Sequence, residues 1–198
     1  MVAERTSNST ASPPTTAAPL AGLRVLDMTQ GIAGPFAAKV MAVMGADVIK
    51  VEPPSGDVAR TQPPFLGDDP HPEKSGLYLY LNTNKRSITL NLAQPAAHNI
   101  LRRLYMWADI VFEDAAPGWF AARDLGYQAL DRINPRAVMV SVTPFGQYGP
   151  YRDYQATDLV ALALGGLLYI SGEPAREPLK LGGHPSEYLA GLSAFSGA

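Results

Sequence analysis

The sequence predicts an α/β fold, a Rossmann-like, largely parallel and doubly wound sheet that is apparently truncated, with a second domain missing. Short apolar runs typical of buried strands alternate with helical patterns, which favours parallel strands joined by crossover helices. A glycine-containing loop follows the first strand. The 198-residue chain is 46% hydrophobic and 17% charged, which provides enough apolar side chains for a core.

The first βαβ unit begins with an apolar strand over 23–27. The loop after it carries Gly31 and Gly34, a helix starts at Pro35, and a second strand follows over 47–51. In such a unit a ligand normally sits at the carboxyl end of the first strand, because the helix N-terminus offers unpaired N–H groups. The unit therefore predicts a phosphate-bearing ligand.

The remaining elements continue the alternation. Further strands are predicted over 87–92, 109–113 and 137–143, and further helices over 95–108, 127–133, 159–164 and 188–198. A proline-rich stretch after Glu52 indicates a long loop over the strand ends, and loops of this length are usually functional. The last helix reaches Ala198 without a stop signal, so we expect the natural unit to continue.

Composition excludes several classes of site. The net charge of −2 does not suggest a nucleic-acid partner, and the lack of cysteine excludes thiolate metal sites and cysteine nucleophiles. Residues 1–19 are rich in Ser, Thr, Ala and Pro and predict a disordered lead-in to a folded unit over 20–198. No apolar run is long enough to span a membrane, which makes the cytoplasm the expected compartment.

Several polar residues leave alternatives open. Glu52 lies where a ribose-binding acid of an NAD enzyme would fall, although the full glycine fingerprint is absent. Lys85 and Arg86 are either phosphate ligands or a solvated strand start. The three histidines lack the spacing of a helical metal site, so no metal is expected.

Two acids stand out late in the chain. Asp158 begins an apolar helix and is interpreted as its N-terminal cap. Glu187 follows a glycine-rich loop and precedes a helix, where a carboxylate is well placed as a nucleophile or base. The alternative for Glu187 is a first-turn acid that complements the helix dipole.

Taken together, a set of short motifs resembles the family III CoA-transferases, which include formyl-CoA and carnitine CoA-transferases. The motifs are Leu20–Asp27, Gly34-Pro35, Gly45–Glu52, Gly56-Asp57 with Arg60, Asn84–Ile88, Ala108–Val111, Pro117-Gly118, Leu125–Tyr127, Asn134-Pro135 and Phe145–Pro150. Their order and spacing are specific, and the resemblance covers about Leu20 to the end, as the N-terminal part of the family's large domain.

The resemblance implies an open Rossmann-like domain that binds coenzyme A as a substrate, in an interlocked homodimer. Family members transfer CoA from an acyl-CoA to a carboxylic acid. An aspartate attacks the thioester to form a mixed anhydride, which CoA thiolate then reopens to an enzyme-bound CoA thioester.

Carried over by position, Gln30, Gly31, Ile32 and Ala33 match the CoA-contacting loop. Four further positions match the nucleotide side of the family site: Leu90, Asp114, Ala115 and Arg123. Of these, Asp114 and Ala115 stand where the family usually has Asn-Phe, and Arg123 is shifted by one residue from a nucleotide-holding arginine.

The chain departs from the family pattern in three ways. Glu187 occupies the position of the catalytic aspartate, and its extra methylene displaces the carboxylate. Thr157 stands where related racemases have a histidine, and family members are about twice this length. Three interpretations remain: a CoA-transferase with Glu187 as acyl acceptor, completed by a homodimer or a complementing second chain; a non-catalytic CoA-binding or interaction subunit; and an NAD-dependent enzyme.

Overall fold

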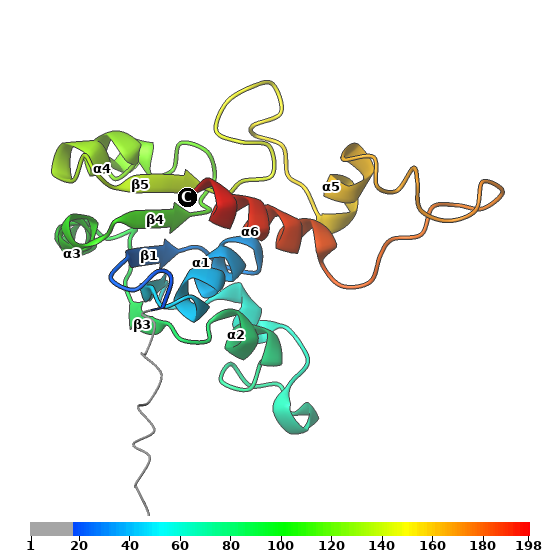
Figure 1. The fold of residues 1–198 in the computed structure, drawn as a ribbon, viewed down its shortest axis with the longest axis horizontal. Helices are drawn as coiled ribbons and strands as arrows, with labels where there is room; N and C mark the ends of the chain where they lie inside the picture. Colours follow the sequence, from blue (N-terminus) through cyan, green and yellow to red (C-terminus); the bar gives the residue numbers. More distant parts are fainter. Residues whose placement is uncertain (1–17) are drawn as a thin grey trace, which may run out of the picture.

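The computed structural model describes residues 18–198, so the expected lead-in lies outside the described residues except for its last two. A sheet of five parallel strands runs through the molecule in the order β3-β2-β1-β4-β5 (Figure 1). The strands are β1 (Arg24–Met28), β2 (Asp47–Glu52), β3 (Arg86–Thr89), β4 (Ile110–Glu113) and β5 (Val138–Ser141).

Helices cover both faces of this sheet. The α-helices are α1 (Ala33–Val43), α2 (Gly76–Leu81), α3 (Pro95–Trp107), α4 (Tyr127–Ile133), α5 (Asp158–Leu164) and α6 (Pro185–Gly197), with short 3₁₀ turns η1 (Val58–Thr61), η2 (Leu66–Asp68) and η3 (Ala121–Arg123). α1 and α6 lie side by side over one face, and α3 and α4 pack on the other (Figure 1). The predicted doubly wound α/β fold is confirmed.

Strand side chains alternate between the two cores. Val25 packs with α1 on one face, whereas its neighbour Leu26 packs with α3 and α4 on the other. Both side chains are fully buried, as expected for a parallel strand covered by helices on both sides. This double burial explains why the strands appear in the sequence as short continuous apolar runs.

The strand order places a crevice between β1 and β4. The chain leaves β1 toward β2 in one direction and returns to β4 on the opposite side, so the loops after β1 and β4 diverge at their carboxyl ends. Ligands of open α/β sheets bind at such a switch point. In register, Met28 pairs with Glu113 at this edge.

Two element boundaries lie three residues from their predicted positions, and the others differ by at most two residues. β3 ends at Thr89 rather than at residue 92, so Leu90 lies beyond the strand. The last helix begins at Pro185, and Glu187 therefore lies in its first turn. Figure 1 also shows α5 and the loop after it projecting away from the sheet. Within residues 18–198, no helix is both long and apolar enough to cross a bilayer.

Candidate active site

A hydrogen bond spans the crevice between β1 and β4. The backbone N–H of Gln30, in the loop after β1, donates to Asp114 Oδ2, in the loop after β4, over 2.7 Å. Both residues line two cavities, one of about 400 Å³ and one of about 380 Å³. The two cavities therefore adjoin at Gln30 and Asp114, where a single elongated ligand can occupy both.

The first cavity, here the Leu90 cavity, has an apolar and aromatic wall. Its lining residues are Met28, Gln30, Val51, Pro53, Leu90, Asn91, Leu92, Ala93, Asp114, Ala115, Ala116, Trp119 and Phe120. Apolar and aromatic walls with a few polar groups suit a flat ring system such as a nucleotide base. Four of the predicted cofactor-binding residues, Gln30, Leu90, Asp114 and Ala115, are together in this cavity.

The second cavity, here the Glu187 cavity, contains three carboxylates. Asp114, Asp158 and Glu187 line it together with Gln30 and Ala33, and its remaining lining residues are small or neutral. Glu187 lies in the first turn of α6, near the positive end of the helix dipole.

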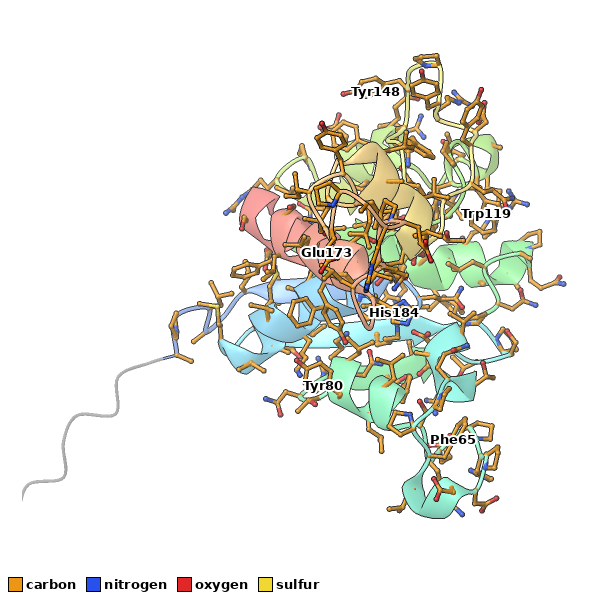
Figure 2. The ribbon with its side chains drawn as sticks, turned by 90° about the vertical axis from the view of Figure 1, so that its right-hand side faces the viewer. Phe65, Tyr80, Trp119, Tyr148, Glu173 and His184 are labelled. Atoms are coloured by element: carbon orange, nitrogen blue, oxygen red, sulfur yellow. The ribbon has the colours of Figure 1, made fainter. Side chains whose placement is uncertain are left out.

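The Glu187 side chain is accessible, with 37% of its surface exposed. The Nδ1 atom of His184 lies 3.3 Å from Glu187 Oε1, and Figure 2 shows His184 beside the start of α6. The carboxylate thus shares a cavity with Gln30 and Ala33 of the predicted CoA loop, and carboxylates can act as nucleophiles toward carbonyl carbons.

Buried acids hold the loop after β1 in place. Gly31 has a φ of 71°, a conformation that favours glycine, and its N–H donates to Asp57 Oδ1 over 2.9 Å. The Lys50 ammonium donates to the carbonyl of Thr29 and lies 2.7 Å from Asp57 Oδ2. The loop is therefore fixed by contacts to its backbone, which leaves the side chain of Gln30 facing the cavities.

The charges behind this loop perturb one another. Burial raises the pKa of Asp27, but Lys50 and Lys85 outweigh it and lower that pKa to about 2. Burial lowers the pKa of Lys85 to about 8 against the attraction of Asp27. Burial raises the pKa of Asp114 to about 7, although the Gln30 N–H and Lys50 oppose the rise. Asp114 is thus the acid of the crevice that changes charge near neutral pH.

Three predicted cofactor-binding residues, Gly31, Ile32 and Arg123, do not line either cavity. Ile32 is 4% exposed and is the N-cap residue of α1, so its side chain contributes to the core. Arg123 lies at the end of η3, where its guanidinium sits 4.0 Å from the centre of the Trp119 ring and donates to the Trp119 carbonyl. Arg123 therefore reaches the Leu90 cavity only through Trp119.

Two interpretations of charged residues were wrong because the residues have buried partners. Lys85 is neither a phosphate ligand nor solvated, since its ammonium lies 2.8 Å from Asp27 Oδ2 and its side chain is 1% exposed. Glu52 is not free for a ribose, because it accepts hydrogen bonds from Arg60, Tyr78 and Ser87. The Arg60, Tyr78 and Ser87 bonds overcome the effect of burial and lower the pKa of Glu52 to about 2.

The cap assigned to Asp158 was also wrong. Thr157 is the N-cap residue of α5, and its hydroxyl accepts the N–H of Val160 over 3.4 Å. Asp158 is the first helical residue and turns instead toward α6, where it binds Ser186. A side-chain partner so far along the chain has no signal in the local sequence.

The sequence analysis did not single out several of the lining residues, three of which are polar or aromatic groups that can contact a ligand. Trp119 and Asn91 line the Leu90 cavity, and Thr143 lines the Glu187 cavity with a buried hydroxyl that has no hydrogen-bond partner among the described residues. Trp119 carried a usable signal, because it follows the Pro117-Gly118 turn directly after a strand that ends at the sheet edge. No group of three or more His, Asp or Glu side chains within residues 18–198 is arranged to hold a metal ion.

Comparison with known proteins identifies close relatives. The family model described as CoA-transferase family III matches residues 20–198. The chain is 38% identical over 179 residues to the succinyl-CoA:glutarate CoA-transferase of Homo sapiens, covering 89% of this chain and 40% of the relative. It is 40% identical over 182 residues to the succinyl-CoA–L-malate CoA-transferase beta subunit of Chloroflexus aurantiacus, covering 90% of this chain and 44% of that subunit.

A solved structure shares the fold. The crystal structure of a CAIB/BAIF family protein from Brucella suis superposes with a TM-score of 0.84 at 37% identity, and the match covers 91% of this chain and 48% of that one. The chain therefore spans less than half the length of these relatives.

Proposed function

This chain belongs to CoA-transferase family III, and from that premise we propose that it is the CoA-binding, N-terminal part of the large domain of an enzyme that moves CoA from an acyl-CoA to a carboxylic acid. The observation that carries the proposal is the shared wall of the two cavities. Gln30 and Asp114 join the Leu90 cavity, which suits the nucleotide, to the cavity that contains Glu187.

In this proposal CoA lies along the crevice. The adenine packs against Leu90, Ala115 and Trp119, and the phosphates pass the loop of Gln30 to Ala33 near the N-terminus of α1. Arg123, stacked on Trp119, supports the aromatic wall and lends positive charge beside it. The thioester then reaches the cavity of Glu187.

In this reaction Glu187 carries first the acyl group, as an anhydride, and then CoA, as a thioester. A carboxylate oxygen of Glu187 attacks the thioester carbonyl, CoA thiolate leaves, and a mixed anhydride forms. The thiolate attacks the glutamyl carbonyl of the anhydride, which releases the donor acid and leaves a glutamyl-CoA thioester. The acceptor carboxylate attacks this thioester and expels the thiolate, which then attacks the acceptor's acyl carbon and frees Glu187.

A second chain or a further segment is expected over α5 and α6. Both helices carry large exposed apolar side chains, among them Leu159, Leu164, Leu189 and Leu192. Apolar surface of this extent usually marks an interface. It fits either an interlocked homodimer or a complementing chain, and the Chloroflexus relative is itself named as a subunit.

A non-catalytic CoA-binding subunit is the second candidate. It is favoured by Glu187 standing where the family has aspartate, and by the partial length relative to the relatives. The NAD-dependent interpretation loses its main support, because Glu52 is occupied by Arg60, Tyr78 and Ser87.

The test is Glu187→Gln in the intact protein. Succinyl-CoA is the first donor to try, because both curated relatives described above are named for it. After incubation with succinyl-CoA, hydroxylamine converts an acylated or CoA-bound glutamate into a hydroxamate, which peptide mass spectrometry locates. We expect the hydroxamate on Glu187 in the wild type and none in Glu187→Gln, with calorimetric CoA affinity unchanged.

Glu173→Gln is the matched control. Glu173 is an exposed acid in the projecting loop (Figure 2), and its ion pair among residues 18–198 is with Arg176 at 3.5 Å. The Glu173→Gln variant should form the Glu187 hydroxamate at the wild-type rate. CoA binding with no hydroxamate in the wild type would favour the non-catalytic subunit, and a hydroxamate that persists in Glu187→Gln would contradict the role of Glu187.

A further inference from the structure

One carboxylate binds the first turn of α6 from a different helix. Asp158, the first residue of α5, accepts the backbone N–H of Ser186 over 2.9 Å through Oδ1, which also accepts the Ser186 hydroxyl. Ser186 immediately precedes Glu187. Asp158 and Glu187 both line the Glu187 cavity, so this contact lies at the base of the proposed acyl acceptor.

The start of α6 has no cap of its own. The N-cap residue His184 makes no side-chain cap hydrogen bond, and Pro185 has no N–H. Ser186 therefore supplies the first N–H of the helix that needs an acceptor. Asp158 fills the role of an N-cap across 28 residues of sequence, and its negative charge complements the positive end of the α6 dipole.

A lysine fixes Asp158 in turn. Lys180 Nζ lies 2.7 Å from Asp158 Oδ2 and donates to the carbonyl of Gly183 over 2.7 Å. Burial raises the pKa of Asp158, but hydrogen bonds from Lys180 and Ser186 outweigh burial and lower it. The carboxylate therefore remains ionised at neutral pH and ties the segment before α6 to the helix itself.

We propose that Asp158 is the positioning residue for Glu187: by binding Ser186 it sets the first turn of α6 so that the Glu187 carboxylate faces the CoA thioester. The assignment rests on the proposed function of Glu187. Asp158 is held by Ser186 and Lys180 and is not the acyl acceptor, whereas the Glu187 carboxylate contacts only the exposed His184 ring among residues 18–198 and is open to the cavity.

The test measures single-turnover formation of the Glu187 adduct from succinyl-CoA in the intact protein. Asp158→Ala removes the acceptor and should slow the adduct about a hundredfold, because displacement on the scale of 1 Å costs about this factor. Asp158→Asn keeps an acceptor for the Ser186 N–H and should lose about tenfold. CoA affinity should change by less than about threefold in both, since neither removes a residue of the Leu90 cavity.

Ser186 provides the matched pair of variants. Ser186→Ala removes only the hydroxyl bond and should slow the adduct by several-fold, whereas Ser186→Thr keeps the hydroxyl and should restore the rate. A general loss of folding would lower CoA affinity and adduct rate together, and would not be rescued by threonine.

Hydrogen exchange provides a readout independent of activity. Asp158→Ala should speed amide exchange in the first turn of α6, while exchange in α1 and β1 stays unchanged. A hydroxamate located on Asp158, an unchanged adduct rate in Asp158→Ala, or unchanged exchange at α6 would each overturn the assignment. If the wild type forms no adduct, the proposed function fails by itself, and the exchange experiment still decides whether Asp158 holds the turn.

Discussion

The two sides of the Glu187 cavity are held in place in different ways. The loop of Gln30 and Gly31 is anchored by its backbone to Asp114 and Asp57, behind which Lys50 is almost fully buried. The first turn of α6 is anchored by Asp158 and Lys180, and the Lys180 side chain is 35% exposed. One side belongs to the sheet, whereas the other rests on helix-to-helix contacts at the surface.

This difference predicts that substitutions behind the CoA loop mainly affect stability, whereas substitutions around α6 mainly affect activity. Buried ions that lose a partner are costly, so changes behind the CoA loop should unfold the protein. The Asp158–Lys180 pair is partly exposed at Lys180, so losing it should cost less stability than losing Lys50 and should mainly alter where Glu187 points. Three substitutions test this division, from the largest expected effect to the smallest.

Lys50→Met should have the largest effect on stability. It removes the cation that lies 2.7 Å from the buried Asp57 carboxylate and leaves Asp27 with Lys85 alone, which should lower the free energy of unfolding by about 3–5 kcal/mol. Urea unfolding of the intact protein measures the change. Arg86→Met is the control, because Arg86 and Asp47 form an exposed pair worth under about 1 kcal/mol. Equal losses in the two variants would contradict the division.

Gly191→Ala should act on the helix pair. A Cβ atom at Gly191 would lie 2.5 Å from the Ala33 carbonyl oxygen, so α6 must move away from α1. We expect a loss of about 1–3 kcal/mol of unfolding free energy and a slower adduct on Glu187. Gly197→Ala, with no atom within 4 Å of the added Cβ, should change neither quantity. A wild-type adduct rate in Gly191→Ala would show that Glu187 tolerates displacement of α6.

Asp114→Asn should have the smallest effect, and the effect depends on pH. The folded protein raises the pKa of Asp114 to about 7 from an unfolded value near 3.9, so it binds this proton more tightly than the unfolded chain does. The resulting stabilisation is present below about pH 4 and is lost as the pH rises through about 7.

Urea unfolding of both proteins between pH 6 and pH 8 measures this loss. Over that range the free energy of unfolding of the wild type should fall by about 1–2 kcal/mol relative to that of Asp114→Asn, because the variant carries no titrating group at this position. Asp69→Asn, at an exposed acid paired with Lys74, should follow the wild-type curve. Parallel curves for wild type and Asp114→Asn would contradict the titration of Asp114 in this range.

Sequence patterns predicted the elements well where burial is regular. The helix over 127–133 has the same bounds in the structure. The central strands β1 and β4 were placed because strands buried on both faces are short continuous apolar runs, whereas β3 is exposed along its length. The motif order also indicated which residues gather at the sheet edge: Gln30, Leu90, Asp114, Ala115 and Glu187 do meet in two adjoining cavities.

Partners of charged residues were not predictable in the same way. Lys85 donates a hydrogen bond to Asp27, which is 58 residues away in the sequence. Tyr78 donates to Glu52 over a separation of 26 residues, and Asp158 accepts from Ser186 over a separation of 28. Local sequence records only that these residues are charged or polar. Their burial and pKa shifts depend on which strands and helices become neighbours, which is a property of the assembled fold.

The sequence alone determined the class of fold and the family, because apolar periodicity and motif order are local and survive without knowledge of contacts. Only the tertiary structure decided that Glu52 and Lys85 have buried partners, and that Asp158 binds Ser186 in the first turn of α6. The physical reason is that the energy of a charge depends on its burial and its partner, and both are set by residues distant along the chain.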